Sequence, residues 1–158
     1  MRLGIISDTH GLLRPEVHDV FKKVDRILHA GDVGDASILD ELGMIAPVRA
    51  VHGNTDAGIL RSHLPETIEE KIDDFRFVML HGHQLGGPKP AALKAMYPDA
   101  DVIIYGHTHL PLIHNFEDFS LTLNPGSAGP KRFDQPVTVG IMETEPGIPP
   151  RARIVPLL

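Results

Sequence analysis

The stretch "VIIYGHTHLP", residues 102–111, joins an apolar run to two histidines. Residues 102–105 predict a short β-strand, because continuous apolar runs rich in β-branched side chains are typical of strands that are covered on both faces. Gly106 ends the run, and His107 and His109 follow before Pro111. A buried strand that delivers two imidazoles where it leaves the core indicates a functional site at its carboxyl end.

Four earlier segments have the same character, at residues 3–7, 26–29, 48–51 and 77–80. Between these runs the apolar residues take helical spacing. Residues 15–24 place Val17, Val20, Phe21 and Val24 on one face, and residues 36–42 and 90–96 predict two further helices. Strands that alternate with helices in this way favour a parallel sheet covered by helices.

The remaining segments predict strands joined by tight connections, at residues 67–72, 112–116, 121–124, 137–143 and 152–156. "NFEDFS", residues 115–120, is typical of a hairpin loop. The Pro-rich "EPGIPPRARIVPLL", residues 145–158, predicts a turn before a final edge strand. We therefore predict an α/β fold in which two mixed β-sheets pack face to face, flanked by helices, in a single domain over residues 1–158.

Composition narrows the function classes. The 158 residues are 42% hydrophobic and carry a formal net charge of −6, without a basic patch, so a nucleic-acid polymer is not an expected partner. There is no cysteine, which excludes disulfides and thiolate metal sites. No apolar stretch approaches the roughly 18 residues of a membrane span, and no leader pattern is visible, so we expect no membrane association and a cytoplasmic location.

Polar residues follow the strands that alternate with helices. The carboxyl ends of parallel strands face a common crevice in open α/β sheets, so these side chains are expected to converge. All are nitrogen or oxygen metal ligands. They are Asp8 and His10 after the first strand, Asp32 after the second, Asn54 after the third, His81 after the fourth, and His107 and His109 after the fifth.

The spacing of these residues suggests two ions rather than one. Residues two apart on an extended segment point to the same side, so Asp8 and His10 can share a site. Seven protein ligands exceed what one ion accepts while it stays open for chemistry. Two divalent ions about 3.5–4 Å apart, bridged by a carboxylate, accommodate them. Asp32 stands alone on its loop and is the predicted bridge.

Other conspicuous residues have simpler interpretations. Five histidines lack a second ligand at useful spacing and are expected to be ordinary hydrogen-bonded residues: His18, His29, His52, His63 and His114. His83 lies two residues after His81 and can line the same cleft. "GHQLGGPK", residues 82–89, is not a phosphate-binding P-loop, because Pro88 occupies the lysine position. We interpret it as a flexible loop over the cleft.

Together the motifs resemble the calcineurin-like metallophosphoesterases. The matching elements, over residues 2–141, are "DTH" at 8–10, "GD" at 31–32, "GN" at 53–54, "HGH" at 81–83 and "GHTH" at 106–109. "NPGSAGPKR", residues 124–132, further resembles the small, single-domain YfcE-like phosphodiesterase group. The resemblance implies a two-sheet sandwich flanked by helices.

The same resemblance implies roles for individual residues. Asp8, His10 and His109 would hold the first ion, and Asn54, His81 and His107 the second, with Asp32 between them. Asp32, Asn54 and His107 would be catalytic. Asn54, Thr55 and His83 would contact the substrate. Many family members carry a histidine where this chain has Thr55, and a threonine hydroxyl is not a general acid near pH 7. His83 or a metal-bound water would then protonate the leaving group.

The predicted function is hydrolysis of a small phosphodiester by a hydroxide that bridges two divalent cations. Imidazole and carboxylate ligands favour Mn, with Ni, Fe, Co or Zn as alternatives. A phosphomonoesterase would use the same site. A scaffold that resembles the small retromer subunit is the alternative from another class, and an exposed apolar patch would favour it. The sequence does not decide whether the protein forms a homo-oligomer. Few aromatic residues are available to stack on a nucleobase, and Phe133 is the only one beside the "NPGS" loop.

Overall fold

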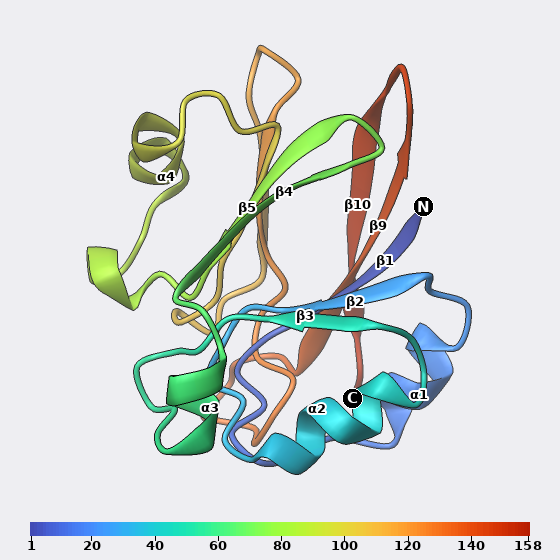
Figure 1. The fold of residues 1–158 in the computed structure, drawn as a ribbon, viewed down its shortest axis with the longest axis vertical. Helices are drawn as coiled ribbons and strands as arrows, with labels where there is room; N and C mark the ends of the chain where they lie inside the picture. Colours follow the sequence, from blue (N-terminus) through green and yellow to red (C-terminus); the bar gives the residue numbers. More distant parts are fainter.

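The computed structural model describes residues 1–158 and contains two five-stranded sheets (Figure 1). The first has the order β10-β9-β1-β2-β3 and the second β4-β5-β6-β8-β7. The first comprises β1 (Arg2–Ile6), β2 (Arg26–His29), β3 (Val48–Ala50), β9 (Thr138–Glu145) and β10 (Ile148–Pro156). The second comprises β4 (Thr67–Ile72), β5 (Phe75–Leu80), β6 (Val102–Ile104), β7 (Leu112–Asn115) and β8 (Leu121–Asn124). In the first sheet β1, β2 and β3 are parallel and β9 and β10 antiparallel, and in the second sheet a parallel centre lies between the antiparallel outer strands β4 and β7, which confirms the predicted pair of mixed sheets.

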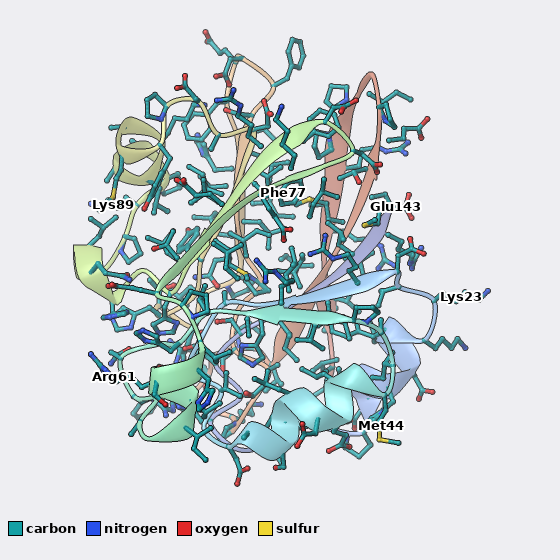
Figure 2. The ribbon with its side chains drawn as sticks, in the orientation of Figure 1. Lys23, Met44, Arg61, Phe77, Lys89 and Glu143 are labelled. Carbon is teal, nitrogen blue, oxygen red and sulfur yellow. The ribbon has the colours of Figure 1, made fainter.

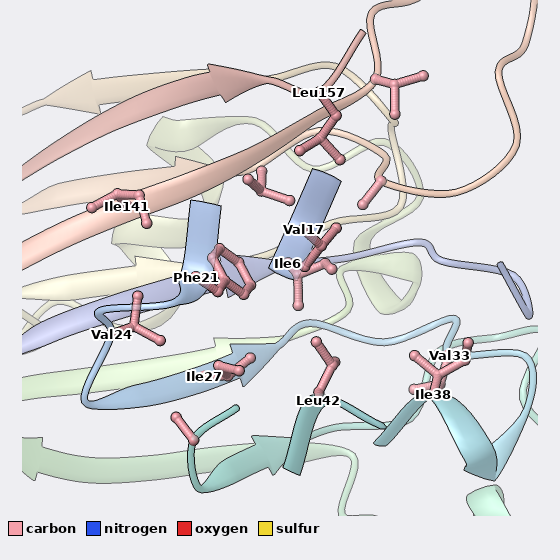
Figure 3. Packing of buried hydrophobic residues seen from close by; sticks show 14 of the residues in the cluster. Ile6, Val17, Phe21, Val24, Ile27, Val33, Ile38, Leu42, Ile141 and Leu157 are labelled. Carbon is pink, nitrogen blue, oxygen red and sulfur yellow. The ribbon is translucent and has the colours of Figure 1, made fainter. Parts of the chain in front are cut away.

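Alternation along the strands builds the layers. Leu3 and Ile5 of β1 pack in the cluster between the two sheets, where Phe77 of β5 also lies (Figure 2). Ile6 faces the opposite side and packs with Phe21 against the helices that cover the first sheet (Figure 3). Because successive side chains of a strand point to opposite faces, the central strands β1, β2 and β9 of the first sheet contribute to both clusters.

The helices cover the outer faces of the sandwich. Helices α1 (Glu16–Phe21) and α2 (Ala36–Gly43) contribute apolar side chains to the cluster on the first sheet. Helix α4 (Pro90–Met96) covers the second sheet through Leu93, which packs against Ile103 and Tyr105. None of the helices has the length and apolar character needed to cross a membrane.

Three details differ from the prediction. Helix α1 ends at Phe21 rather than at residue 24, although Val24 still packs in the core. Helix α3 (Ile59–His63) and the short 3₁₀ helix η1 (His83–Leu85) were not predicted, because neither is long enough to show helical periodicity. Strand β10 begins at Ile148, within the segment predicted as a turn. Its register shifts between Ile148 and Arg151, and an edge position tolerates the intervening prolines.

Candidate metal centre

The predicted ligands lie where the carboxyl ends of strands from both sheets meet. Backbone hydrogen bonds join the loops that follow β1 and β2, from Asp8 N to Gly31 O (3.0 Å) and from His10 N to Asp32 O (3.0 Å). In the second sheet, Gly106 N donates to His81 O (2.9 Å). The site therefore straddles the two sheets at one end of the sandwich, rather than lying in the crevice of a single open sheet.

Asp8 lies at the centre of the cluster and is fully buried. Its Oδ2 accepts hydrogen bonds from Ser7 Oγ (2.6 Å) and from His107 N (3.2 Å). Its Oδ1 has no hydrogen-bond partner and faces three imidazoles. It lies 3.2 Å from His109 Nε2, 3.7 Å from His81 Nε2 and 3.8 Å from His10 Nε2. One carboxylate oxygen is thus fixed by the protein, and the other is left to bind something else.

Asp32 is the second buried carboxylate. Its Oδ1 accepts from Thr55 N (3.0 Å), and its Oδ2 lies 3.1 Å from His81 Nε2 and 3.8 Å from His10 Nε2. Burial acts to raise the pKa of Asp32, but the His81 imidazole and the Thr55 donors outweigh it and hold the pKa well below its usual range. Asp32 is therefore ionised at neutral pH.

His81 shows which ring nitrogen is available for a ligand. Its Nδ1 donates to Ala30 O (2.8 Å), so the neutral ring carries its lone pair on Nε2. That Nε2 is buried and makes no hydrogen bond. Burial acts to lower the pKa of His81, but Asp32, Asp8 and the Ala30 carbonyl raise it overall. A backbone carbonyl that fixes the tautomer in this way is characteristic of metal-ligating histidines.

Two acid and histidine groups converge closely enough to hold a metal ion: Asp8 with His10 and His109, and Asp8 with Asp32 and His81. The Nε2 atoms of His10 and His109 are 3.4 Å apart. Unpartnered buried atoms on Asp8 and His81 point into the same space, and burying such groups is costly unless something compensates them. The donor set, with only nitrogen and oxygen atoms, fits a divalent cation.

The other predicted site residues flank these groups. The His107 ring lies 5.2 Å from the His81 ring, and the His83 ring lies 5.6 Å from His81 and 6.4 Å from His107, measured between centroids. Burial, together with His81 and His107, lowers the pKa of His83. Asn54 and Thr55 are exposed on the loop after β3, where the Thr55 backbone touches Asp32. His83 and His107 thus lie on the His81 side of the cluster, and Thr55 lies on the Asp32 side.

We predicted that Asp8 and His10 share a site because residues two apart on an extended segment point to the same side. That explanation is wrong. Asp8, His10, His107 and His109 are not in extended backbone but have φ angles of 55°, 46°, 71° and 62°. Asp32 has a φ of 53°. Both members of each pair reach the site, but they do so from the left-handed region, which is uncommon for residues other than glycine. The hydrophobic pattern that predicted the strands contains no signal for this conformation.

Three supporting residues were not assigned a role from the sequence. Asp56 is buried and accepts from the backbone N–H groups of Val33 (3.2 Å), Gly34 (3.0 Å) and Gly53 (2.9 Å), which ties the loops after β2 and β3 together. Asn124 Nδ2 donates to Gly106 O (3.1 Å), and Ser127 Oγ donates to Asp8 O (3.0 Å). The polar run after β3 and the "NPGS" motif were the available signals.

The five histidines interpreted as ordinary residues do not join the convergent groups. His29 is buried, accepts from Gly31 N (3.1 Å) and contacts Thr9 Oγ1 (3.0 Å). His18 pairs with Glu41 on the surface (2.9 Å). The His114 side chain makes no hydrogen bond and packs edge-on against Phe116 (4.6 Å between ring centroids), and that none of the five is a ligand stays a prediction.

Comparisons with known proteins agree with this geometry. The profile of the family described as "Calcineurin-like phosphoesterase superfamily domain" matches residues 1–147. A "Probable metallophosphoesterase" of Methanothermobacter thermautotrophicus is 41% identical over 145 residues, which cover 86% of this chain and 82% of the relative. "Phosphodiesterase MJ0936" of Methanocaldococcus jannaschii is 32% identical, over 92% of this chain and 94% of that protein.

A more distant relative and a solved structure extend the comparison. "Phosphodiesterase YfcE" of Escherichia coli K12 is 28% identical over 92% of this chain and 89% of that protein. The structure of Vps29 from Entamoeba histolytica, which was complexed with Zn²⁺, superposes with a TM-score of 0.78 at 26% identity and covers all of both chains (100% each). The fold is thus shared by proteins named phosphodiesterase and by Vps29.

Proposed function

Because this chain belongs to the calcineurin-like phosphoesterase superfamily, we propose that it is a metal-dependent phosphodiesterase with a two-metal site. The observation that carries the proposal is that two buried atoms able to ligate a metal, Asp8 Oδ1 and His81 Nε2, converge without any hydrogen-bond partner. They lie in a cluster of carboxylates and imidazoles. Manganese remains the favoured metal, since no thiolate is present to favour a softer ion.

Two ligand sets account for the cluster. Asp8, His10 and His109 would hold one ion, and His81, His107 and Asn54 the other. Asp32 would bridge them, because its Oδ2 lies 3.8 Å from His10 of the first set and 3.1 Å from His81 of the second. When bound, such a pair of divalent cations provides hydroxide at neutral pH and neutralises charge on the phosphoryl oxygens.

The remaining site residues would bind and orient the substrate. The Asn54 amide and the Thr55 hydroxyl are exposed on the loop after β3, where both can donate hydrogen bonds to phosphoryl oxygens. His83 lies beside His107, and its buried Nδ1 has no partner. Thr55 cannot act as an acid, so we expect esters with good leaving groups to be hydrolysed fastest.

The test is an activity assay on protein stripped of metal and reloaded with Mn, Ni, Mg or Zn. Bis-p-nitrophenyl phosphate and p-nitrophenyl phosphate distinguish a diesterase from a monoesterase. We expect turnover of the diester with a transition metal, and a loss of about a thousand-fold or more in Asp32→Asn, since the charge that holds the ions is removed. Asp40→Asn, on the exposed face of α2, is the matched control and should leave turnover unchanged.

A Vps29-like scaffold is the second candidate, and the likeness of the backbone to Vps29 favours it. The two candidates differ in one result. Protein that binds two ions and hydrolyses neither ester with any metal would support the scaffold. Turnover of the monoester alone would instead replace the diesterase with a phosphomonoesterase.

A further inference from the structure

A buried histidine joins the two loops that carry the carboxylates Asp8 and Asp32. His29 is fully buried at the end of β2, and both nitrogens of its ring have a partner. Nδ1 accepts from Gly31 N (3.1 Å), and Nε2 lies 3.0 Å from Thr9 Oγ1. Thr9 is the residue after Asp8. Gly31 is the residue before Asp32, so His29 connects the neighbours of both carboxylates.

The hydrogen bonds around His29 run in one direction. Burial lowers the pKa of His29 to about 4, so the ring is neutral at pH 7. A neutral ring that accepts at Nδ1 carries its proton on Nε2 and donates it to Thr9 Oγ1. The Thr9 hydroxyl then donates to Val33 O (2.8 Å). This chain of Gly31 N, the His29 ring, the Thr9 hydroxyl and Val33 O, here called the His29 relay, therefore begins and ends on the two residues that flank Asp32.

A second buried side chain, Asp56, holds the same segment from the loop after β3. Its Oδ2 accepts from Val33 N (3.2 Å) and from Gly53 N (2.9 Å). Asp32, between the fixed residues, has a φ of 53°, a conformation that residues other than glycine seldom keep without support. The backbone on both sides of Asp32 is thus hydrogen-bonded to buried side chains, of which His29 holds one side and Asp56 the other.

Thr9 links this support to the first ligand set. It directly follows Asp8, and its buried hydroxyl contacts the His29 ring and Val33 O but no ligand side chain. Asp32 would bridge the two ions, so its place relative to Asp8 decides how well both ions are held together. Groups that orient metal ligands without touching the metal commonly change metal affinity or activity about ten- to a hundred-fold when they are removed.

We propose that the His29 relay is a positioning device: it sets the place of Asp32 relative to Asp8, and so determines how tightly the protein holds its ions. This deepens the proposed function and rests on its two-metal site. The side chains of His29 and Thr9 make no hydrogen bond to a ligand side chain. They act through the backbone beside Asp32, so their loss weakens metal binding while every ligand is still present.

Thr9→Val breaks the relay with little change in shape, because it removes the hydroxyl and keeps a branched side chain. We expect calorimetric titration of the metal-free protein with Mn to show binding about ten- to a hundred-fold weaker than in the parent. Thr9→Ser restores the hydroxyl and should recover most of the affinity. Unchanged Mn affinity in Thr9→Val would overturn the proposal, whatever the variant does to stability.

Thr122→Val is the matched control for this substitution. Thr122 is fully buried in β8, and its Oγ1 has no hydrogen-bond partner. The same change of hydroxyl to methyl should therefore leave Mn affinity as it is in the parent. An equal loss of affinity in Thr122→Val and Thr9→Val would mean that any change in the core disturbs the site, and would overturn the relay.

Two substitutions at His29 divide the relay. The Asn amide takes the place of Nδ1 and can still accept from Gly31 N, whereas the Gln amide takes the place of Nε2 and can still donate to Thr9 Oγ1. Each variant should bind Mn about ten-fold more weakly than the parent. Thr9→Val combined with His29→Asn should weaken binding by less than the product of the separate effects, because both remove the same hydrogen bond. An effect equal to the product would show that the two residues act independently, and would overturn the relay.

Hydrogen exchange of backbone amides in the metal-free protein tests the relay without any ion. The Gly31 amide donates to His29 Nδ1. His29→Gln should speed its exchange by about ten-fold or more relative to the amides of β9, and His29→Asn should not. A merely structural role for His29 would speed exchange at Gly31 and in β9 by the same factor, and this result would overturn the proposal.

Metal binding and ester hydrolysis fail separately. If the parent binds two Mn ions and hydrolyses neither ester, while Thr9→Val binds Mn about ten-fold more weakly or worse, the phosphodiesterase fails and the relay stands. If the parent hydrolyses the diester and Thr9→Val binds Mn as tightly as the parent, the phosphodiesterase stands and the relay fails.

Discussion

Apart from Phe133, the non-glycine residues with positive φ angles gather at the two ends of the sandwich, and the two ends use them differently. At the site end, where the ligand loops follow β1, β2 and β6, they are Asp8, His10, Asp32, His107 and His109. At the hairpin end, which lies at the top of Figure 1 and holds the turns that join β4 to β5, β7 to β8 and β9 to β10, they are Asp73, Asp74 and Phe119.

The hairpin end uses the left-handed conformation to reverse the chain. Asp73 and Asp74 are the two residues between β4 and β5, and positive φ at both positions matches the twist of the strands. The site end uses the same conformation to aim side chains. There the atoms it brings together, such as Asp8 Oδ1, lack hydrogen-bond partners. Strain at the hairpin end should therefore be removable without loss of function, and strain at the site end should not.

The largest expected effect comes from adding one methyl group at the site end. In Gly53→Ala the new Cβ would lie 2.6 Å from Asp32 N and contact its Oδ1. Backbone atoms cannot yield easily, so Asp32 must move. We expect metal affinity and kcat/KM to fall about a hundred-fold or more, because small displacements of catalytic groups have effects of this size. Metal titration and the diester assay measure both quantities.

Gly147→Ala at the hairpin end is the counterpart. A Cβ there would meet nothing within 4 Å, but φ is 83°. The variant should lose about 1–2 kcal/mol of unfolding free energy from backbone strain and keep full activity. If Gly53→Ala kept its metals, the close approach to Asp32 would not be what positions the bridge.

The second prediction concerns the charge on Asp8. In Asp8→Asn the metal-free protein should gain about 1–2 kcal/mol in stability, because a buried carboxylate oxygen without a partner is removed. The same variant should lose most of the stabilisation of about 3 kcal/mol that Mn gives the unaltered protein at about a hundred times its dissociation constant. Urea unfolding in the presence of chelator measures the stability of the metal-free protein, and unfolding in the presence of Mn measures the stabilisation that the metal provides.

Asp73→Asn is the control at the hairpin end. Asp73 Oδ2 accepts from the amino terminus (3.0 Å) and from Thr144 Oγ1 (2.8 Å), so its contacts are made within the protein. Its replacement should cost little stability, equally with and without metal, because exposed ion pairs contribute little. A metal-free Asp8→Asn that is less stable than the parent would show that the site end is stabilised by its own contacts.

The contrast between the ends also explains what the sequence could reveal. Periodicity predicted the strands, and polar residues at strand ends predicted every residue of the convergent groups. The left-handed backbone at His107 and His109 was not predictable, because apolar spacing reports burial and not φ. Nor was the Arg14 to Gly129 hydrogen bond, which joins residues 115 apart in sequence. Long-range contacts of this kind are fixed by the assembled sandwich and have no local signal.

The third prediction concerns pH and His29, which lies behind the ligand loops. Burial lowers the pKa of His29 to about 4. Between pH 6.5 and 4 the unfolded chain therefore binds a proton that the folded protein does not, so stability falls as pH falls through this range. In chelator, the unaltered protein should lose about 2 kcal/mol more than His29→Asn between pH 7 and pH 5.

Urea unfolding at the two pH values measures this difference. His18→Asn is the control, because His18 makes only an exposed pair with Glu41, and such pairs contribute little. An equal pH dependence in the unaltered protein and in His29→Asn would mean that His29 is protonated in the folded state, and that the loops behind the ligands tolerate a charge.

The smallest expected effect tests the comparison most directly. Asp74 is exposed, has a φ of 69° and makes no side-chain hydrogen bond or ion pair, so Asp74→Gly removes only strain. The relief of about 1 kcal/mol is largely offset by the greater freedom of glycine in the unfolded chain, which leaves a net gain of about 0.5 kcal/mol or less and no change in activity.

His109→Gly relieves the same strain at a φ of 62° but removes a ligand. Thermal unfolding and the diester assay on both variants separate the two cases. If Asp74→Gly reduced activity, the hairpin end would be coupled to the site, and positive φ would have to be explained in the same way at both ends.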